Sequence, residues 1–198
     1  FKGAIMVNAT KHVRQDVVLK ATQLFWEKGF HASSMRNIQE VMDMRPGSIY
    51  ASFGSKEGLF KEALQCYADA GLARLAACVQ TCSSPLDGLK LFVTEAVLGS
   101  RRSAPSGMCM LMKTISELTQ DNAELLAETQ RLLAVVEEAF AQLLAQAIEA
   151  GELDSGEDPK RLACYLQMQV MGLRAYARAN DDDTQIEELI EDAFGCLR

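Results

Sequence analysis

The sequence contains few residues that break helices and no long hydrophobic run. Only 4 of the 198 residues are proline. No run of apolar residues is longer than five, which excludes a membrane-spanning helix and the core of a signal peptide. We therefore expect a cytoplasmic protein that does not contact membranes. Apolar residues make up 48% of the chain and charged residues 24%, a balance that excludes wholesale disorder and predicts a folded core.

The sequence also lacks the patterns of a metal site or a catalytic site. Its six cysteines include no C-x-x-C pair, and the two histidines, His12 and His31, lie far from Cys78 and Cys82, which have helical spacing. We therefore expect reduced thiols, no structural zinc and no cofactor. A Gly-rich phosphate loop and an H-E-x-x-H motif are absent as well. These absences argue against an enzyme, so an all-helical enzyme and a helical interaction module are kept only as alternatives.

Charge is distributed unevenly along the chain. Residues 1–58 hold 8 Lys+Arg and 5 Asp+Glu, a balance of +3, whereas residues 59–198 hold 12 and 22, a balance of −10. A small basic part joined to a larger acidic part favours a protein whose first part meets a polyanion. Statistical scatter is the alternative. The acidic part would favour neutral or cationic small molecules over anions.

Helical periodicity, capping residues and the lack of strand-like alternation predict an all-α fold of about nine helices. The first helix is expected over 13–28, and residues 1–12 are expected to be a linker remnant and a disordered arm. The other helices are expected over about 35–42, 46–53, 56–82, 85–99, 108–118, 122–150, 159–179 and 183–196.

Residues 34–56 contain a short helix, a tight turn and a second short helix, the arrangement of a helix-turn-helix whose second helix lies in the major groove. Ile49 and Phe53, four positions apart, are expected to face the core. Gly47 costs a helix about 1 kcal/mol relative to alanine, which favours a role in close approach to DNA. Lys56, beside the free amides of the next helix, predicts a phosphate site. The expected outward residues are Arg45, Gly47, Ser48, Tyr50, Ala51 and Ser52.

This segment resembles the DNA-binding domain of the TetR family of bacterial transcriptional regulators. The resemblance covers about 45 residues, from Arg14 to Leu59, and the rest of the chain is similar only in its all-helical pattern. It implies a homodimeric repressor with a three-helix DNA-binding domain over 13–58 and a helical effector-binding and dimerisation domain over 59–198. The residues that carry it are Gly29-Phe30, Ser34, Arg36, Ile38, Gly47-Ser48-Ile49-Tyr50, Phe53, Ser55-Lys56-Glu57 and Leu59.

Roles in binding double-stranded operator DNA follow from the resemblance by position. Ser34 and Arg36 would touch DNA from the first helix of the motif, and Tyr50 and Lys56 would hold phosphates. Family members often have glycine at position 43 and a small residue at position 45, where this chain has Asp43 and Arg45. Two roles stay open for Arg45, a bidentate contact to guanine or a pair with Asp43. The implied reading surface is Arg45, Pro46, Gly47, Ser48, Ala51 and Ser52.

The second part of the chain would hold the effector. Cys109 is expected just inside a helix start, with Arg101 and Arg102 nearby, which favours a reactive thiolate. The segment resembles a Gly-Cys segment in a subgroup of TetR regulators, some of which respond to electrophiles or oxidants through cysteine. The alternative is that Cys109 and its neighbouring methionines are adaptable core residues lining a pocket for an unknown small-molecule effector. The candidate pocket residues are Phe92, Cys109, Met112, Phe140, Tyr165 and Met168.

The last two helices predict a homodimer. They carry more apolar surface than two terminal helices packed on one side can bury, so we expect a four-helix interface with a twofold mate. The apolar residues are Leu162, Leu166, Met168, Val170, Leu173, Tyr176, Ile186, Leu189, Ile190 and Leu197.

Overall fold

The computed structural model describes residues 2–99 and 105–197. Within these ranges the chain forms nine α-helices, one π-helical turn and one 3-10 turn, and no strand, so the predicted all-α fold is confirmed. None of the described helices is long and apolar enough to cross a membrane. In chain order the elements are α1 (Lys2–Lys28), α2 (Met35–Met42), α3 (Pro46–Phe53), α4 (Lys56–Thr81), α5 (Pro85–Thr94), η1 (Glu95–Gly99), α7 (Met110–Glu117), η2 (Gln120–Asn122), α8 (Ala123–Glu149), α9 (Pro159–Ala179) and α10 (Asp183–Gly195).

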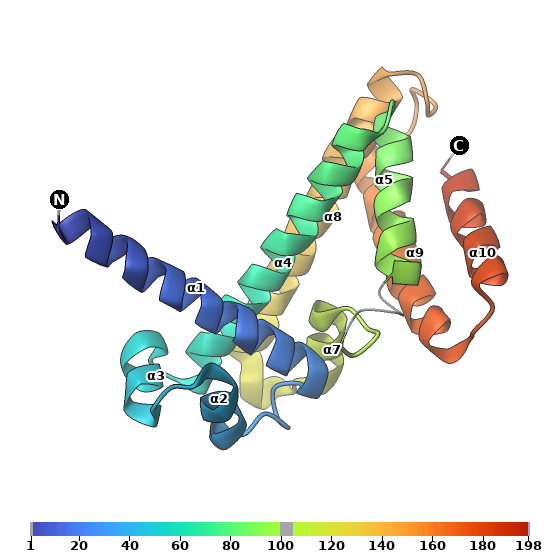
Figure 1. Ribbon diagram of the computed structural model, residues 1–198. Coiled ribbons are helices and arrows are strands. Elements are labelled where there is room, and N and C mark those ends of the chain that lie inside the picture. The colour runs from blue at the N-terminus through green and yellow to red at the C-terminus, as the bar shows by residue number, and fades with distance from the viewer. Residues whose placement is uncertain (1, 100–104, 198) are drawn as a thin grey trace.

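The helices form two groups joined by a pair of long helices. We call α1, α2 and α3 the head and the helices from α4 onward the body. Figure 1 shows α4 and α8 running side by side from the head to the far end of the body, where α5, α9 and α10 gather. The short α7 lies where the two groups meet and contacts α1, α4 and α8. Any signal between head and body therefore has α4 and α7 as direct paths.

The first helix is longer than the sequence indicates. It begins at Lys2 rather than near residue 13, so the prediction of a disordered arm over 1–12 is wrong for residues 2–12. The physical reason is that this stretch contains no proline and that its one glycine, Gly3, lies at the far end, so nothing in it stops a helix that residues 13–28 already nucleate. Figure 1 shows this part of α1 projecting away from the remaining helices.

The helix α2 has the predicted bounds because its start is strongly capped. The Ser34 hydroxyl accepts a hydrogen bond from the Asn37 backbone N–H at 3.1 Å, and the Asn37 side chain accepts one from the Ser34 N–H at 3.2 Å. The apolar spacing predicts Ile38, Val41 and Met42 inward, but Val41 is 42% exposed. With Ile38 and Met42 facing the core, Val41 is rotated by about 100° from Met42, which turns it to solvent.

Two clusters of buried side chains form the core. The head cluster contains the apolar faces of α1, α2 and α3, and it continues past residue 58 into Leu59, Leu64, Leu111 and Leu132 of the body. The body cluster joins α5, α9 and α10 to the last turns of α4 and α8. The head therefore shares its core with α4, α7 and α8 instead of closing on itself at residue 58.

Most of the apolar residues that predict a dimer interface are buried within this chain instead. The helix α10 packs against both α9 and α5, and α5 is the second neighbour that the sequence argument left out. Of the ten predicted residues, Met168 is 58% exposed and Tyr176 is 37% exposed. The residues buried in the body core are Leu162, Leu166, Leu173, Ile186, Ile190 and Leu197.

Candidate DNA-binding surface and effector cavity

The helix α3 exposes a polar face to solvent, while its opposite face packs into the core of the head. Ile49 is fully buried and Phe53 is buried beside it, as predicted. Arg45 precedes the helix as its N-cap, and its guanidinium forms no ion pair with Asp43 in the described part of the chain. A side chain at Gly47 would meet no atom within 4 Å, so packing inside this protein does not require glycine there. The predicted phosphate contact Tyr50 is exposed, and so are all predicted reading-surface residues: Arg45, Pro46, Gly47, Ser48, Ala51 and Ser52.

Arg14 anchors α3 and was not singled out as a functional residue in the sequence. Its Nη1 donates to the Ser52 carbonyl oxygen at 3.0 Å, and its guanidinium carbon lies 4.5 Å from the centre of the Phe53 ring. The same guanidinium pairs with the Glu62 carboxylate on α4. Arg14 thus ties α1 to the last turn of α3 and to α4. Its only signal in the sequence is that it begins the segment resembling TetR proteins.

The other predicted DNA-contact residues are engaged within the head. The Ser34 hydroxyl caps α2, and Arg36 pairs with Glu40 at 2.9 Å on an exposed surface. The Lys56 ammonium lies 4.3 Å from the centre of the Phe30 ring, and burial lowers the pKa of Lys56. Arg36 can leave its surface pair with Glu40 and turn to another partner at little cost in free energy. Lys56 is less free to move, because it is half-buried and contacts an aromatic ring.

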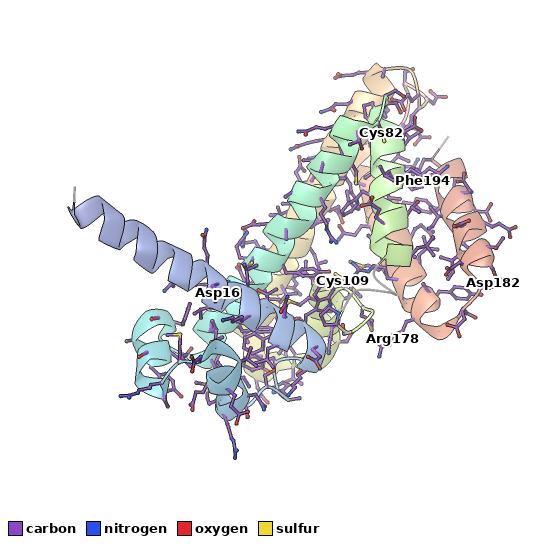
Figure 2. The ribbon with its side chains drawn as sticks, viewed as in Figure 1. Asp16, Cys82, Cys109, Arg178, Asp182 and Phe194 are labelled. Atoms are coloured by element: carbon purple, nitrogen blue, oxygen red, sulfur yellow. The ribbon has the colours of Figure 1, made fainter. Side chains whose placement is uncertain are left out.

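A cavity of about 80 Å³ lies in the body between α4, α5, α8 and α9, with α7 at one end. This volume is several times the roughly 10–15 Å³ that a single water requires. Phe92, Cys109, Met112 and Phe140 line the cavity as predicted. Tyr165 and Met168 do not line it, because α9 turns Tyr165 toward Cys196 and Met168 to solvent. Figure 2 places Cys109 at the junction of head and body.

Three polar side chains of the cavity wall were not predicted from the sequence. Arg174 is 8% exposed and Gln167 is 9% exposed, and both lie on the cavity face of α9. The Arg174 Nη1 donates to the Tyr67 hydroxyl oxygen over 3.5 Å. Burial raises the pKa of Tyr67 to about 12, so this phenol stays protonated. The sequence of α9 does contain a pattern that could have indicated them, because Gln167 and Arg174 interrupt a face of otherwise apolar residues.

The helix α7 joins the cavity to the head. Its Met112 lines the cavity, while Lys113 Nζ donates to the carbonyl oxygens of Trp26 at 3.1 Å and Glu27 at 2.7 Å. The Glu117 carboxylate accepts hydrogen bonds from the backbone N–H groups of Phe30 at 2.9 Å and His31 at 2.6 Å. A single short helix therefore contacts the cavity and holds the end of α1 in place.

The described residues contain no group of three or more His, Cys, Asp or Glu side chains able to hold a metal ion. The cysteines differ in environment. Burial, with a smaller effect of Glu95, raises the pKa of the Cys78 thiol, which disfavours its reactive thiolate form. Cys109 is half-buried at the cavity wall beside Tyr67.

The chain is similar to known transcriptional regulators, and the similarity extends over most of the length of those proteins. The chain is 26% identical to the HTH-type transcriptional repressor ComR of Escherichia coli over 181 residues, which is 90% of this chain and 84% of ComR. It is 24% identical to the HTH-type regulator YezE of Bacillus subtilis over 183 residues, 91% of this chain and 94% of YezE.

Solved structures of TetR regulators share the fold. A cysteine mutant of CifR, complexed with 26-base-pair operator DNA, has a TM-score of 0.80 and 24% identity, covering 92% of this chain and 95% of CifR. The reduced form of Escherichia coli NemR has a TM-score of 0.76 and 19% identity, covering 94% of this chain and 95% of NemR.

Two family models match the chain. Residues 18–63 match the model of bacterial regulatory proteins of the tetR family, and residues 85–193 match the tetracyclin repressor-like C-terminal domain. The second match alone spans more than half of the chain, and the first includes the helix-turn-helix. The chain therefore belongs to the tetR family of bacterial regulatory proteins, which are transcriptional regulators and not enzymes.

Proposed function

We propose that this protein is a homodimeric repressor that binds a double-stranded operator through α3 and releases it when a small-molecule effector occupies the body cavity. The observation that carries the proposal is the exposed polar face of α3, which is held against the core of the head by the buried side chains of Ile49 and Phe53. The operator DNA bound in the CifR structure is consistent with it. Binding to a chromosomal operator implies a cytoplasmic location.

The surroundings of Arg45 and Gly47 favour direct contact with bases. Arg45 lies at the start of α3 with its guanidinium free of Asp43, so it can form the bidentate contact to guanine that arginine makes in the major groove. Gly47 has open space beside it. Its cost to the helix is therefore better explained by close approach of the backbone to DNA than by packing within the head.

Gel shifts with DNA from upstream of the protein's own gene test this proposal. Arg45→Ala should weaken operator binding by about 5- to 150-fold, the equivalent of 1–3 kcal/mol, and random DNA much less. Lys56→Ala should weaken both DNAs alike, because a phosphate contact carries no sequence information. Arg131→Ala, an exposed arginine of α8 paired with Glu128, is the control. Wild-type affinity in both head variants would contradict the proposed surface.

The route from cavity to head passes through α7. Release requires two arrangements of the protein, with the effector binding one better than the other. A shift of α7 driven from the cavity would be transmitted to the end of α1 through Lys113 and Glu117, and α1 in turn holds α3 through Arg14. A coupling of about 1–3 kcal/mol would relax operator affinity by roughly 5- to 150-fold.

Dimerisation is assigned to the exposed face of α9. Cys164, Met168, Gly172 and Tyr176 recur every four residues and are all exposed, which gives an apolar or small-residue stripe on one side of the helix. Pairing of this face and of α10 with a twofold mate would form a four-helix interface. Two heads could then reach major grooves about 34–36 Å apart.

A second candidate trigger is modification of Cys109, favoured by its position at the cavity wall beside Tyr67. Peroxide would transfer one oxygen to the thiolate sulfur and leave as water, producing a sulfenic acid. If this is the trigger, peroxide or a quinone should weaken operator binding of the wild type, and Cys109→Ser should bind the operator but not respond. An identical response of both proteins would exclude Cys109 and leave the reversible ligand as the trigger.

A further inference from the structure

We infer that the body cavity is built for a small amphipathic acid, with a carboxylate or similar anionic head group held by Arg174 and an apolar portion against the remaining wall. The inference rests on the proposed function, because it names the class of effector for the cavity described above. The observation that carries it is a pair of buried polar atoms, Arg174 Nε and Gln167 Oε1, that belong to cavity-lining residues and have no hydrogen-bond partner among the described residues.

Arg174 is a buried cation that forms no ion pair with a carboxylate in the described part of the chain. No carboxylate is among the residues that line the cavity, and the only other charged lining residue is Arg74, which is exposed. The Arg174 Nε has no hydrogen-bond partner within residues 2–99 and 105–197. The contact from Nη1 to Tyr67, at 3.5 Å, is at the long limit for a hydrogen bond. A buried guanidinium in this state is costly unless an acceptor reaches it.

Gln167 lies seven residues before Arg174, two helical turns along the same face of α9. Its Oε1 is buried without a partner, so it offers an acceptor site to a hydroxyl or N–H group of the ligand. Tyr67 contributes a protonated hydroxyl at the Arg174 end, where the Trp26 ring lies 5.0 Å from the tyrosine ring. Arg174 and Tyr67 can thus both donate to a carboxylate, with charge-assisted bonds from the arginine.

The rest of the wall is apolar and limits the ligand to a compact hydrophobic body. Leu75, Phe92, Val136, Phe140 and Val170 surround the polar pair, and the cavity volume is about 80 Å³. The overall charge of the body would favour neutral or cationic molecules, but a buried cation in direct contact outweighs distant surface charges that salt screens. Arg174 therefore decides the preferred charge of the ligand.

Isothermal titration calorimetry with three matched probes tests the inference. Benzoate, benzamide and benzylammonium share one ring and differ in charge, and hexanoate adds an aliphatic acid. The purified wild type should bind benzoate at least tenfold more tightly than benzamide and should not bind benzylammonium. Arg174→Met should lose the preference for benzoate over benzamide. Arg74→Met, which removes the exposed arginine at the same wall, is the matched control and should keep it.

A second variant guards against a folding defect. Arg174→Lys keeps the positive charge but loses the planar guanidinium, so benzoate binding should weaken at least threefold while benzoate is still preferred over benzamide. Absence of benzoate and hexanoate binding to the wild type at 10 mM, equal affinity for benzoate and benzamide, or an unchanged preference in folded Arg174→Met would each overturn the inference.

Operator binding separates this inference from the proposed function. Gel shifts of wild type and Arg174→Met without ligand should show the same operator affinity within about twofold, and benzoate should weaken only the wild-type complex. Failure of the ligand-free wild type to bind DNA would contradict the repressor function and leave the calorimetric result intact. Intact DNA binding combined with failed benzoate recognition would instead overturn the acid as effector.

Discussion

At the scale of single residues, Gly29 combines a backbone constraint with a steric one. Its φ of +85° lies in the left-handed region that favours glycine. The space where a β-carbon would stand is occupied by the Glu117 carboxylate, which holds the two following backbone N–H groups. The end of α1 and the carboxylate of α7 thus fit together only with glycine at this position.

Gly29→Ala should therefore lower the free energy of unfolding by more than the backbone penalty for a left-handed alanine. A left-handed alanine costs about 1–2 kcal/mol, and displacement of Glu117 adds to this. Gly151→Ala is the matched control, because Gly151 also has a positive φ, +75°, but open space beside it. Urea unfolding should show a larger loss for Gly29→Ala than for Gly151→Ala. Equal losses would mean that the contact with Glu117 contributes nothing.

Ser34 has a capping role in the structure and a proposed DNA contact, and substitution can separate the two. Its hydroxyl caps α2, so Ser34→Ala should lower the free energy of unfolding by about 1 kcal/mol, whereas Ser34→Gly should cost only a few tenths because glycine is a tolerated N-cap. If the hydroxyl also contacts DNA, both variants should bind the operator more weakly to the same degree. Urea unfolding and gel shifts measure the two effects; wild-type operator affinity in Ser34→Gly would argue against a DNA contact.

At the scale of elements, α7 is a direct path between cavity and head. Its position is set by Lys113 and Glu117, whose polar ends hold the carbonyl and N–H groups left unpaired at the end of α1. Such bonds to charged side chains are stronger than neutral ones. This arrangement makes the last turn of α1 dependent on the position of α7, as the proposed release mechanism requires.

Glu117→Ala should loosen the segment that follows α1. Hydrogen bonds to charged groups contribute about 1.5–3 kcal/mol, so the backbone amides of Phe30 and His31 should exchange their hydrogens at least about tenfold faster. Glu124→Ala is the control, because Glu124 pairs with Lys61 on an exposed surface, where ion pairs contribute little. Unchanged exchange at both amides in Glu117→Ala would contradict the role given to α7.

At the scale of the whole molecule, the proposed repressor function requires two heads at a defined spacing. The apolar residues of α10 are buried within the chain against α5 and α9. The proposed contact with the twofold mate therefore uses the exposed stripe on α9. Met168 is the most exposed large apolar residue of that stripe. Its burial against a second copy would remove an apolar surface that the single chain leaves in water.

Met168→Glu should convert the dimer to a monomer at micromolar concentration. A carboxylate at the centre of a twofold interface would face its own copy and would have to be desolvated. Light scattering measures the change, and Val135→Glu, at a 37% exposed apolar position on α8, should leave the dimer intact. A wild-type monomer, or a dimer that persists in Met168→Glu, would contradict the assignment of the interface to α9.

Features that depend on residues three or four positions apart could be predicted from the sequence. The bounds of α2 and α3, the inward Ile49 and Phe53, and the exposed face of α3 follow from capping and helical periodicity. Phe92 and Phe140 at the cavity follow from the same periodicity, because each lies on the inner face of its helix. Local rules carry these features because each helix is formed by bonds within one turn.

Only the tertiary structure decided which distant side chains meet. Arg14 reaches Ser52 across 38 positions and Arg174 reaches Tyr67 across 107, and no local spacing indicates either pair. Tyr165 and Met168 share the apolar character of cavity residues, yet the rotation of α9 turns both away from the cavity. That rotation is set by packing against α8, α10 and η1 together, so the position of Arg174 at the cavity wall follows only from the complete tertiary structure.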